Sequence, residues 1–139
     1  GAIKKLISAL RRDERVAMLL DQNVMPEEGG EFVDFFDLKA PVSRAAEALC
    51  LSTHAAIVFT YCLPMNDGTY EVRSKEVLSE NSSSLTKGDV TARIVRVMQD
   101  VIRENPGKWL WMYKRWKYIP DGEDARRYPF YAAGFPCDK

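Results

Sequence analysis

Helix-like and strand-like patterns of hydrophobic residues alternate along the chain, and this alternation limits the fold more than any other feature. The segments 15–20 (RVAMLL) and 54–62 (HAAIVFTYC) are apolar on both faces, as strands covered from both sides are. Apolar stripes at helical spacing run through residues 3–10 and 90–102, and Pro41 is expected to open a further helix. The sequence therefore predicts an α/β fold.

Turn signals add detail to this fold. The Asn-Asp-Gly tripeptide at 66–68 predicts a hairpin, which adds an antiparallel neighbour and makes the sheet mixed, with helices flanking it. The short run 31–36 (EFVDFF) is a further expected strand. Residues 79–88 form a polar loop that is too short to link two domains, so we expect residues 1–139 to form a single domain.

The stretch 104–117 (ENPGKWLWMYKRWK) combines aromatic and basic residues in a chain with no net charge. We expect Asn105 to cap a helix that has Pro106 in its first turn. Four residues fall on one arc of this helix and are expected to face the core: Trp109, Met112, Tyr113 and Trp116. Trp111 falls on the basic side, where it either packs against a neighbouring element or contacts a membrane or partner surface.

The charge and hydropathy patterns exclude several classes of protein. Twenty basic and twenty acidic residues cancel, and residues 21–37 contain six carboxylates and no Lys or Arg. Because no continuous basic track exists, we expect no nucleic-acid partner. No apolar run approaches the ~20 residues that span a bilayer, and no signal peptide is visible, so the chain is expected to be soluble or membrane-peripheral.

The three cysteines give no metal or disulfide signature. Cys50, Cys62 and Cys137 are widely spaced, and the chain has a single histidine, His54. This pattern supports neither a zinc site nor a disulfide framework, so no metal and no cofactor are expected. We expect reduced thiols, with Cys50 and Cys62 in the core.

Residues 104–128 (ENPGKWLWMYKRWKYIPDGEDARRY) resemble the C-terminal signature of the bacterial lipid A biosynthesis acyltransferases, the lauroyl and myristoyl transferase family. That signature runs roughly Pro-Glu-Gln-Tyr-Leu-Trp-x-His-Arg-Arg-Phe-Lys-x-Arg-Pro-x-Gly, followed by Tyr. The matching residues are Pro106, Leu110, Trp111, Arg115, Lys117, Pro120, Gly122 and Tyr128. Trp109, Lys114 and Trp116 are like-for-like replacements, and Tyr113 stands where the family often has His.

Three earlier landmarks extend the resemblance over nearly the whole chain. LLDQ at 19–22 resembles the family's Asp-Gln or Asp-His after a buried strand, FVDFF at 32–36 its Val-x-Phe-Phe, and NDGTYEV at 66–72 its Asp-Gly-x-Tyr strand. The chain departs from the pattern at Asp37, where the family usually has Gly, and it lacks the arginine that usually enters the Asp-Gly-Tyr hairpin.

The resemblance implies an α/β domain that transfers a fatty acyl chain from a thioester, usually on acyl carrier protein, to a lipid hydroxyl. The family's general base is the histidine of a His-x₄-Asp/Glu motif. His54 does not fit this motif, because Phe59 occupies the carboxylate position, and we expect His54 to be a structural residue at the start of a buried strand. We therefore expect the chain to be the C-terminal half of such a domain, with the motif upstream of Gly1, and to be inactive alone.

The resemblance also points to particular residues. Asp21 is implied in a supporting catalytic role with Gln22 beside it; an Asx-type turn or helix cap is the alternative for Asp21. Arg115 and Lys117 are implied to meet lipid phosphates or the acidic surface of acyl carrier protein, or else to pair with the acidic segment 21–37. The predicted substrate-binding residues are Gln22, Trp111, Lys114, Arg115 and Lys117.

Two functions therefore stay open at this level. The first is a membrane-peripheral acyltransferase at the cytoplasmic face of the inner membrane, with acyl carrier protein as donor and a lipid as acceptor. The second is a noncatalytic α/β module that binds lipid or an acidic protein through the helix expected at 106–118. A small unrelated α/β protein is the third alternative. A half-domain would also expose a sheet edge, so the isolated chain is expected to be able to self-associate.

Overall fold

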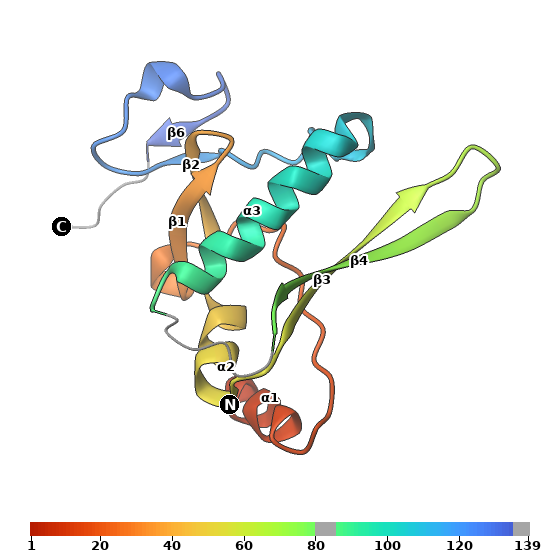
Figure 1. The fold of residues 1–139 in the computed structure, drawn as a ribbon. Coiled ribbons are helices and arrows are strands. Elements are labelled where there is room, and N and C mark those ends of the chain that lie inside the picture. Colours follow the sequence, from red (N-terminus) through yellow and green to blue (C-terminus); the bar gives the residue numbers. More distant parts are fainter. Residues whose placement is uncertain (80–85, 135–139) are drawn as a thin grey trace. The chain divides into compact units, whose positions relative to one another are not determined.

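The computed structural model describes residues 1–79 and 86–134. Contacts divide the chain into two compact units, Gly1–Met18 with Ala45–Trp109 and Leu19–Arg44 with Leu110–Lys139 (Figure 1). The helices are α1 (Ala2–Leu10), α2 (Ala45–Thr53) and α3 (Asp89–Glu104), and the 3-10 turns are η1 (Pro26–Glu28), η2 (Pro106–Lys108) and η3 (Ala125–Arg127). The strands are β1 (Gly30–Phe35), β2 (Leu38–Ser43), β3 (Ile57–Pro64), β4 (Tyr70–Leu78), β5 (Tyr118–Ile119) and β6 (Ala133–Gly134).

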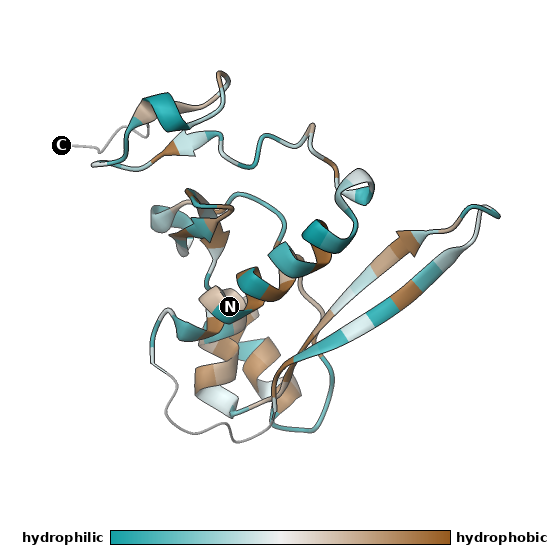
Figure 2. Cartoon of the chain, turned by 45° about the horizontal axis from the view of Figure 1, so that its top comes forward, coloured by the Kyte–Doolittle hydropathy of each residue, from teal (hydrophilic) through white to brown (hydrophobic). Residues whose placement is uncertain are grey.

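The first unit is built around α3. Its apolar stripe is buried as the helical spacing predicts: Val90, Ile94, Val95, Met98, Val101 and Ile102. Figure 2 shows apolar and polar residues alternating along this helix. The helix contacts α2, β3 and β4, and α1 contacts α2. It ends at Glu104, because Pro106 disfavours helical geometry at the residue before it.

The β3–β4 hairpin confirms the turn that Asn-Asp-Gly predicts. The two strands pair antiparallel with Cys62 opposite Val72, and Gly68 adopts a φ of 83° in the turn. Residues of β3 alternate between half-buried and exposed rather than being buried on both faces, so the prediction of a doubly covered strand at 54–62 is wrong. Of the helices, α3 packs against this two-stranded ribbon, and a ribbon covered on one face leaves the other open. Cys50 is buried as expected, but Cys62 is exposed, so its predicted place in the core is wrong.

The predicted role of His54 is also wrong. This residue does not begin a buried strand; it follows α2 with a positive φ of 58°, and its side chain is exposed. Its backbone N–H donates a hydrogen bond to the carbonyl of Cys50 at 2.7 Å. His54 therefore lies at the C-terminal end of α2, where a left-handed residue commonly terminates a helix.

The second unit is built on the β1–β2 hairpin. Phe35 pairs with Leu38, which leaves Phe36 and Asp37 as a two-residue loop, and both have positive φ, 52° and 62°. This is the geometry of a type I′ turn, in which Asp is tolerated at a position that the family usually fills with Gly. The core of this unit includes four fully buried side chains of the hairpin: Phe35, Ala40, Pro41 and Val42.

Two predicted elements differ from the structure. Residues 15–20 form no strand and are largely exposed, since no described segment pairs with them. Pro41 lies within β2 opposite Phe32, and the helix begins only at Ala45. A proline is accepted there because a two-stranded ladder has an outer edge that needs no N–H donor.

The α/β class is confirmed. The described strands form antiparallel pairs β1–β2 and β3–β4 and a short parallel pair β5–β6, so both orientations occur, in separate ladders. That residues 1–139 form one domain stays a prediction. Within the described ranges, no helix has the length and apolarity needed to cross a membrane.

Candidate functional site

The segment 106–118 is not the helix that its spacing predicts. After the short turn η2 the chain is irregular up to β5. Its burial is the reverse of the helical expectation: Met112, expected in the core, is 86% exposed, whereas Arg115 is only 1% exposed. Trp116 is half-buried, and its Nε1–H donates to the carbonyl of Phe35 at 3.0 Å. Hydrogen bonds to β1 and β2 hold this segment in place of an internal helical ladder.

Arg115 is the centre of the second unit. Its Nη1 donates to Asn23 Oδ1 at 2.6 Å and to the carbonyl oxygen of Pro41 at 2.9 Å. The guanidinium carbon lies 5.5 Å from the centroid of the Phe35 ring, a cation–π arrangement. Nε and Nη2 are buried and have no hydrogen-bond partner among the described residues. Arg115 therefore joins the segment after residue 22 to β2.

Burial also makes the Arg115 guanidinium more acidic. It lowers the pKa of the Arg115 guanidinium to about 10, while the nearby Tyr113 and Asp21 act in the opposite direction and raise it. A guanidinium removed from water without a hydrogen-bonded carboxylate is costly, so its two hydrogen-bond acceptors matter to the stability of the unit.

Asn23 is the residue that sequence reasoning missed. Its backbone N–H donates to Tyr113 Oη at 2.8 Å, its Nδ2 donates to the carbonyl of Lys114 at 3.1 Å, and its Oδ1 accepts from Arg115. Three consecutive residues of the C-terminal signature are thus bound to one asparagine some ninety positions earlier. The only signal in the sequence was its place directly after Asp21-Gln22.

Asp21 and Gln22 lie in a bend just before Asn23, and both side chains are exposed. The charge of Asp21 acts on Arg115, so the two are neighbours within the unit. Within the second unit, the family landmark at 19–22 and residues 113–115 of the C-terminal signature, which are far apart in the sequence, are therefore brought together. The supporting catalytic role of Asp21 and the substrate-binding role of Gln22 stay predictions.

The other predicted binding residues lie at the surface. Trp111 is half-exposed, with its ring 6.2 Å from Phe36 and stacked on Trp116 at 6.5 Å. Lys114 and Lys117 are exposed, with Nζ 5.9 Å from the Tyr131 ring and 4.9 Å from the Tyr118 ring. Arg115 alone is withdrawn from the surface. Its hydrogen bond to segment 21–37 is made to Asn23 and not to a carboxylate.

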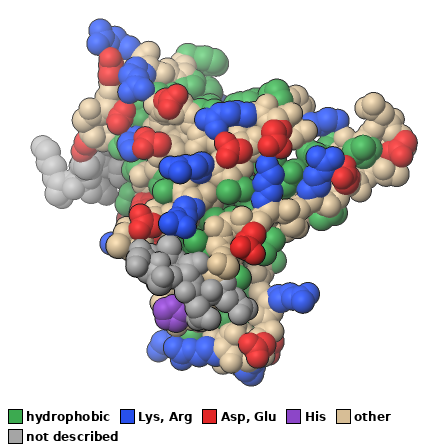
Figure 3. All heavy atoms as spheres, in the orientation of Figure 1, with side chains coloured by type: hydrophobic (Ala, Val, Ile, Leu, Met, Phe, Trp, Pro, Cys, Tyr) green, Lys and Arg blue, Asp and Glu red, His purple; other side chains and the backbone are tan. Residues whose placement is uncertain are grey.

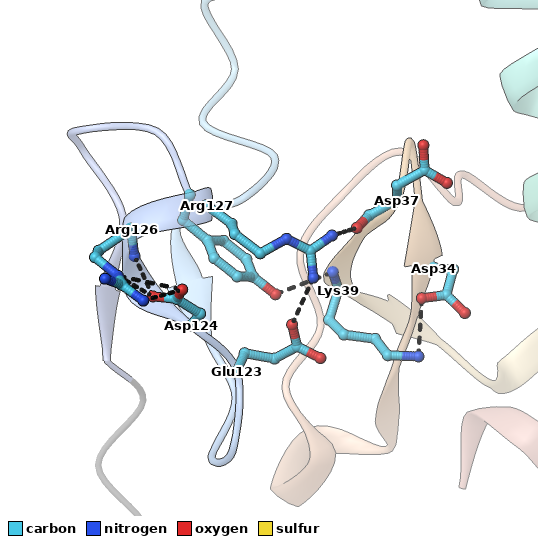
Figure 4. Close-up of polar contacts among 8 residues, drawn as sticks. Asp34, Asp37, Lys39, Glu123, Asp124, Arg126 and Arg127 are labelled. Atoms are coloured by element: carbon cyan, nitrogen blue, oxygen red, sulfur yellow. Dashed lines mark hydrogen bonds and ion pairs between the residues drawn. The ribbon is translucent and has the colours of Figure 1, made fainter.

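The tip of the β1–β2 hairpin is held by the end of the signature (Figure 4). Arg127 Nη2 donates to the carbonyl of Asp37 at 2.8 Å, and Arg127 Nη1 lies 3.8 Å from Glu123. Tyr128 Oη accepts a hydrogen bond from the backbone N–H of Lys39 at 3.0 Å, and burial raises the pKa of Tyr128. Tyr128, a residue of the family signature, thus helps to fix the turn that contains Asp37.

Basic and acidic side chains are interspersed on one face of the molecule (Figure 3). Figure 3 shows basic and acidic side chains side by side on the face drawn, without a field of one sign. This distribution agrees with the zero net charge and confines any electrostatic recognition to local groups.

These features define a class of protein: an α/β chain in which an Asp-Gln segment is tied to an aromatic and basic C-terminal signature through a buried arginine. The family model described as bacterial lipid A biosynthesis acyltransferase matches residues 1–118, and the chain belongs to this family. The family's general activity is acyl transfer in lipid A biosynthesis. No curated protein matches the chain.

Proposed function

We propose that these 139 residues supply part of a site that moves a fatty acyl chain from an acyl thioester on acyl carrier protein to a lipid hydroxyl. In this proposal Asp21 is the supporting carboxylate, at the edge of the site where the reacting groups meet. The family assignment supports the reaction class, and the geometry around Asn23 supports the placement of Asp21.

One observation carries the proposal. The segment that contains Asp21 and Gln22 is fixed to the C-terminal signature by Asn23, which bonds to Tyr113, Lys114 and Arg115. A catalytic group has to be held in position by neighbours whose own geometry is fixed. Because Arg115 is buried, it cannot bind the acidic surface of a carrier protein. In this proposal it supports the site by holding the segment that contains Asp21 and by its positive charge.

The general base lies outside these residues. Acyl transfer needs a group that takes the proton of the acceptor hydroxyl and donors that stabilise the oxyanion of the thioester carbonyl. His54 is the only histidine, it is exposed at the end of α2, and Phe59 stands where the His-x₄-Asp/Glu motif requires a carboxylate. We therefore propose that the 139-residue chain alone does not catalyse the transfer.

Lipid and donor recognition falls to exposed residues around the buried arginine. Gln22, Trp111, Lys114 and Lys117 are accessible, and the two lysines suit a phosphate or the acidic surface of a carrier protein. The cytoplasmic face of the inner membrane, where both substrates meet, is the proposed place of action.

The role of Asp21 can be tested in the native gene product. We expect Asp21→Asn to lower kcat about tenfold to a hundredfold, the usual effect of losing a residue that supports a catalytic group. The midpoint of thermal unfolding should not change, because the Asp21 side chain is exposed. The matched control is Glu27→Gln, an exposed carboxylate of the same loop, which should leave kcat unchanged. If both variants had the kcat of the wild type, Asp21 would have only a structural role in the turn.

A second candidate function is a noncatalytic module that binds lipid or an acidic protein through segment 106–118. The exposure of the aromatic and apolar residues in this segment favours it. The two functions differ in one observable: the native gene product of an enzyme transfers acyl chains and responds to Asp21→Asn, whereas a binding module shows neither effect.

A further inference from the structure

Four consecutive large side chains with apolar character are exposed on the second unit. Leu110 is 65% exposed, Trp111 47%, Met112 86% and Tyr113 38%. Single exposed apolar residues are ordinary, but a run of this length on the surface of a soluble domain calls for a partner that covers it. We refer to residues 110–113 as the LWMY turn.

The LWMY turn has a defined geometry. The backbone N–H of Tyr113 donates to the carbonyl of Leu110 at 3.1 Å, which closes a four-residue turn with Trp111 and Met112 at its centre. The Tyr113 hydroxyl is held by the backbone of Asn23, and the Trp111 ring stacks on Trp116. Because these contacts fix both sides of the turn, its apex is held outward and Met112 stays in solvent.

The charges beside the LWMY turn identify the kind of partner. Lys114 and Lys117 are exposed and lie over tyrosine rings, and no carboxylate within the described ranges forms an ion pair with either of them. A Trp next to a long apolar side chain, followed by uncompensated lysines, matches the layering of an interface with hydrocarbon below and anionic phosphates above.

We propose that the LWMY turn docks this protein onto an anionic lipid bilayer, with Trp111 and Met112 entering the interface and Lys114 and Lys117 meeting headgroup phosphates. The inference deepens the proposed function, because it names the contact through which the chain approaches its lipid acceptor. Vesicle binding requires no acyl transfer, so its failure and the failure of the proposed reaction are separate results.

The test measures co-sedimentation of the 139-residue protein with phosphatidylglycerol–phosphatidylcholine vesicles and with pure phosphatidylcholine vesicles. We expect Met112→Asp to weaken binding to the anionic vesicles about tenfold or more, because burying the methionine side chain contributes that much and an aspartate opposes it. The matched control is Tyr70→Asp, 72% exposed near the turn of the β3–β4 hairpin, which should bind as the wild type does. Circular dichroism checks that both variants are folded.

The contribution of the two lysines to vesicle binding is tested with a separate pair of double variants. Lys114→Ala combined with Lys117→Ala should weaken binding to anionic vesicles by about fivefold for each lysine and leave binding to neutral vesicles unchanged. The control, Lys4→Ala with Lys5→Ala on the exposed side of α1, removes the same charge elsewhere and should have a smaller effect.

Three results would overturn the proposal. Met112→Asp could bind vesicles as tightly as the wild type, or Tyr70→Asp could abolish binding, which would assign the lipid contact to the hairpin. Alternatively, Met112→Asp could change only self-association in sedimentation velocity or only binding to acyl carrier protein, which would show that the LWMY turn has a protein partner.

Discussion

Arg115 is the largest fully buried side chain of its unit, and no carboxylate within the described ranges is hydrogen-bonded to its guanidinium. One nitrogen makes both of its hydrogen bonds, to Asn23 and to the Pro41 carbonyl, and two further donors are unpaired among the described residues. Each buried donor left without an acceptor costs about 1–3 kcal/mol. The two acceptors of Arg115, Asn23 Oδ1 and the Pro41 carbonyl, therefore contribute more to the free energy of unfolding than ordinary surface contacts do.

Asn23→Ala tests this dependence. The substitution removes the side-chain bonds to Arg115 and Lys114 and leaves the guanidinium with the Pro41 carbonyl alone. We expect the free energy of unfolding to fall by about 2–3 kcal/mol, since hydrogen bonds to buried charged groups are worth about 1.5–3 kcal/mol. Urea denaturation followed by tryptophan fluorescence provides the measurement.

The neighbouring variant Gln22→Ala is the control, because it shortens an exposed side chain of the same segment. It should change the unfolding free energy by less than about 0.5 kcal/mol. Similar losses for the two variants would mean that Asn23 is not the anchor of this segment.

Sequence reasoning identified Arg115, Asp21 and Gln22 as candidates but not the residue that joins them. Arg115 was found because it matches the signature, and the helical wheel then placed it on the polar side. Its burial could not be read from spacing, because its partners Asn23 and Pro41 are more than seventy positions away. Pairings of this kind depend on tertiary structure and cannot be predicted from local sequence patterns.

At the level of elements, α3 and segment 106–118 behave in opposite ways. The stripe of α3 repeats over several turns and is buried along its length, so local propensity and packing agree. The spacing of apolar residues in segment 106–118 predicts an amphipathic helix. The side chains of Tyr113, Arg115 and Trp116 instead form hydrogen bonds with distant parts of the chain, and no helix forms. Long periodic segments were predictable from the sequence, whereas this shorter one was decided by tertiary contacts.

The N-terminus of α3 depends on a residue from another helix. Glu47 of α2 is 3% exposed, and its carboxylate accepts hydrogen bonds from the backbone N–H groups of Gly88 and Thr91 and from the Thr91 hydroxyl. Gly88, which precedes the helix, has no side chain to cap it. Glu47 therefore provides the charge and the acceptors that a helix N-terminus favours.

Glu47→Gln should destabilise the first unit by about 1–3 kcal/mol. The amide presents an NH₂ group to backbone donors and no longer provides a negative charge beside the helix N-terminus. Thermal unfolding followed by circular dichroism would record a lower midpoint. Glu76→Gln, an exposed glutamate of β4, is the comparison, and an equal midpoint for the two variants would be inconsistent with a capping role for Glu47.

At the scale of the whole molecule, the family assignment and the residue patterns agree on an acyltransferase-related chain. The α/β class and the hairpin at 66–68 were predictable, because turn chemistry and apolar periodicity act locally. The strand expected at 15–20 was not found, since a strand needs a partner and no described segment provides one. The proposed chemistry likewise needs a His-x₄-Asp/Glu motif beside Asp21, and His54, with Phe59 five residues later, does not form one.

The most direct measurement of the central claim is acyl transfer by the 139-residue chain alone, from acyl–acyl carrier protein to a lipid acceptor. We predict no product above the rate without protein, while a family enzyme with an intact His-x₄-Asp/Glu motif, assayed in parallel, gives turnover. Sustained turnover by the 139 residues would contradict the account, because it would show that the proton acceptor lies within them.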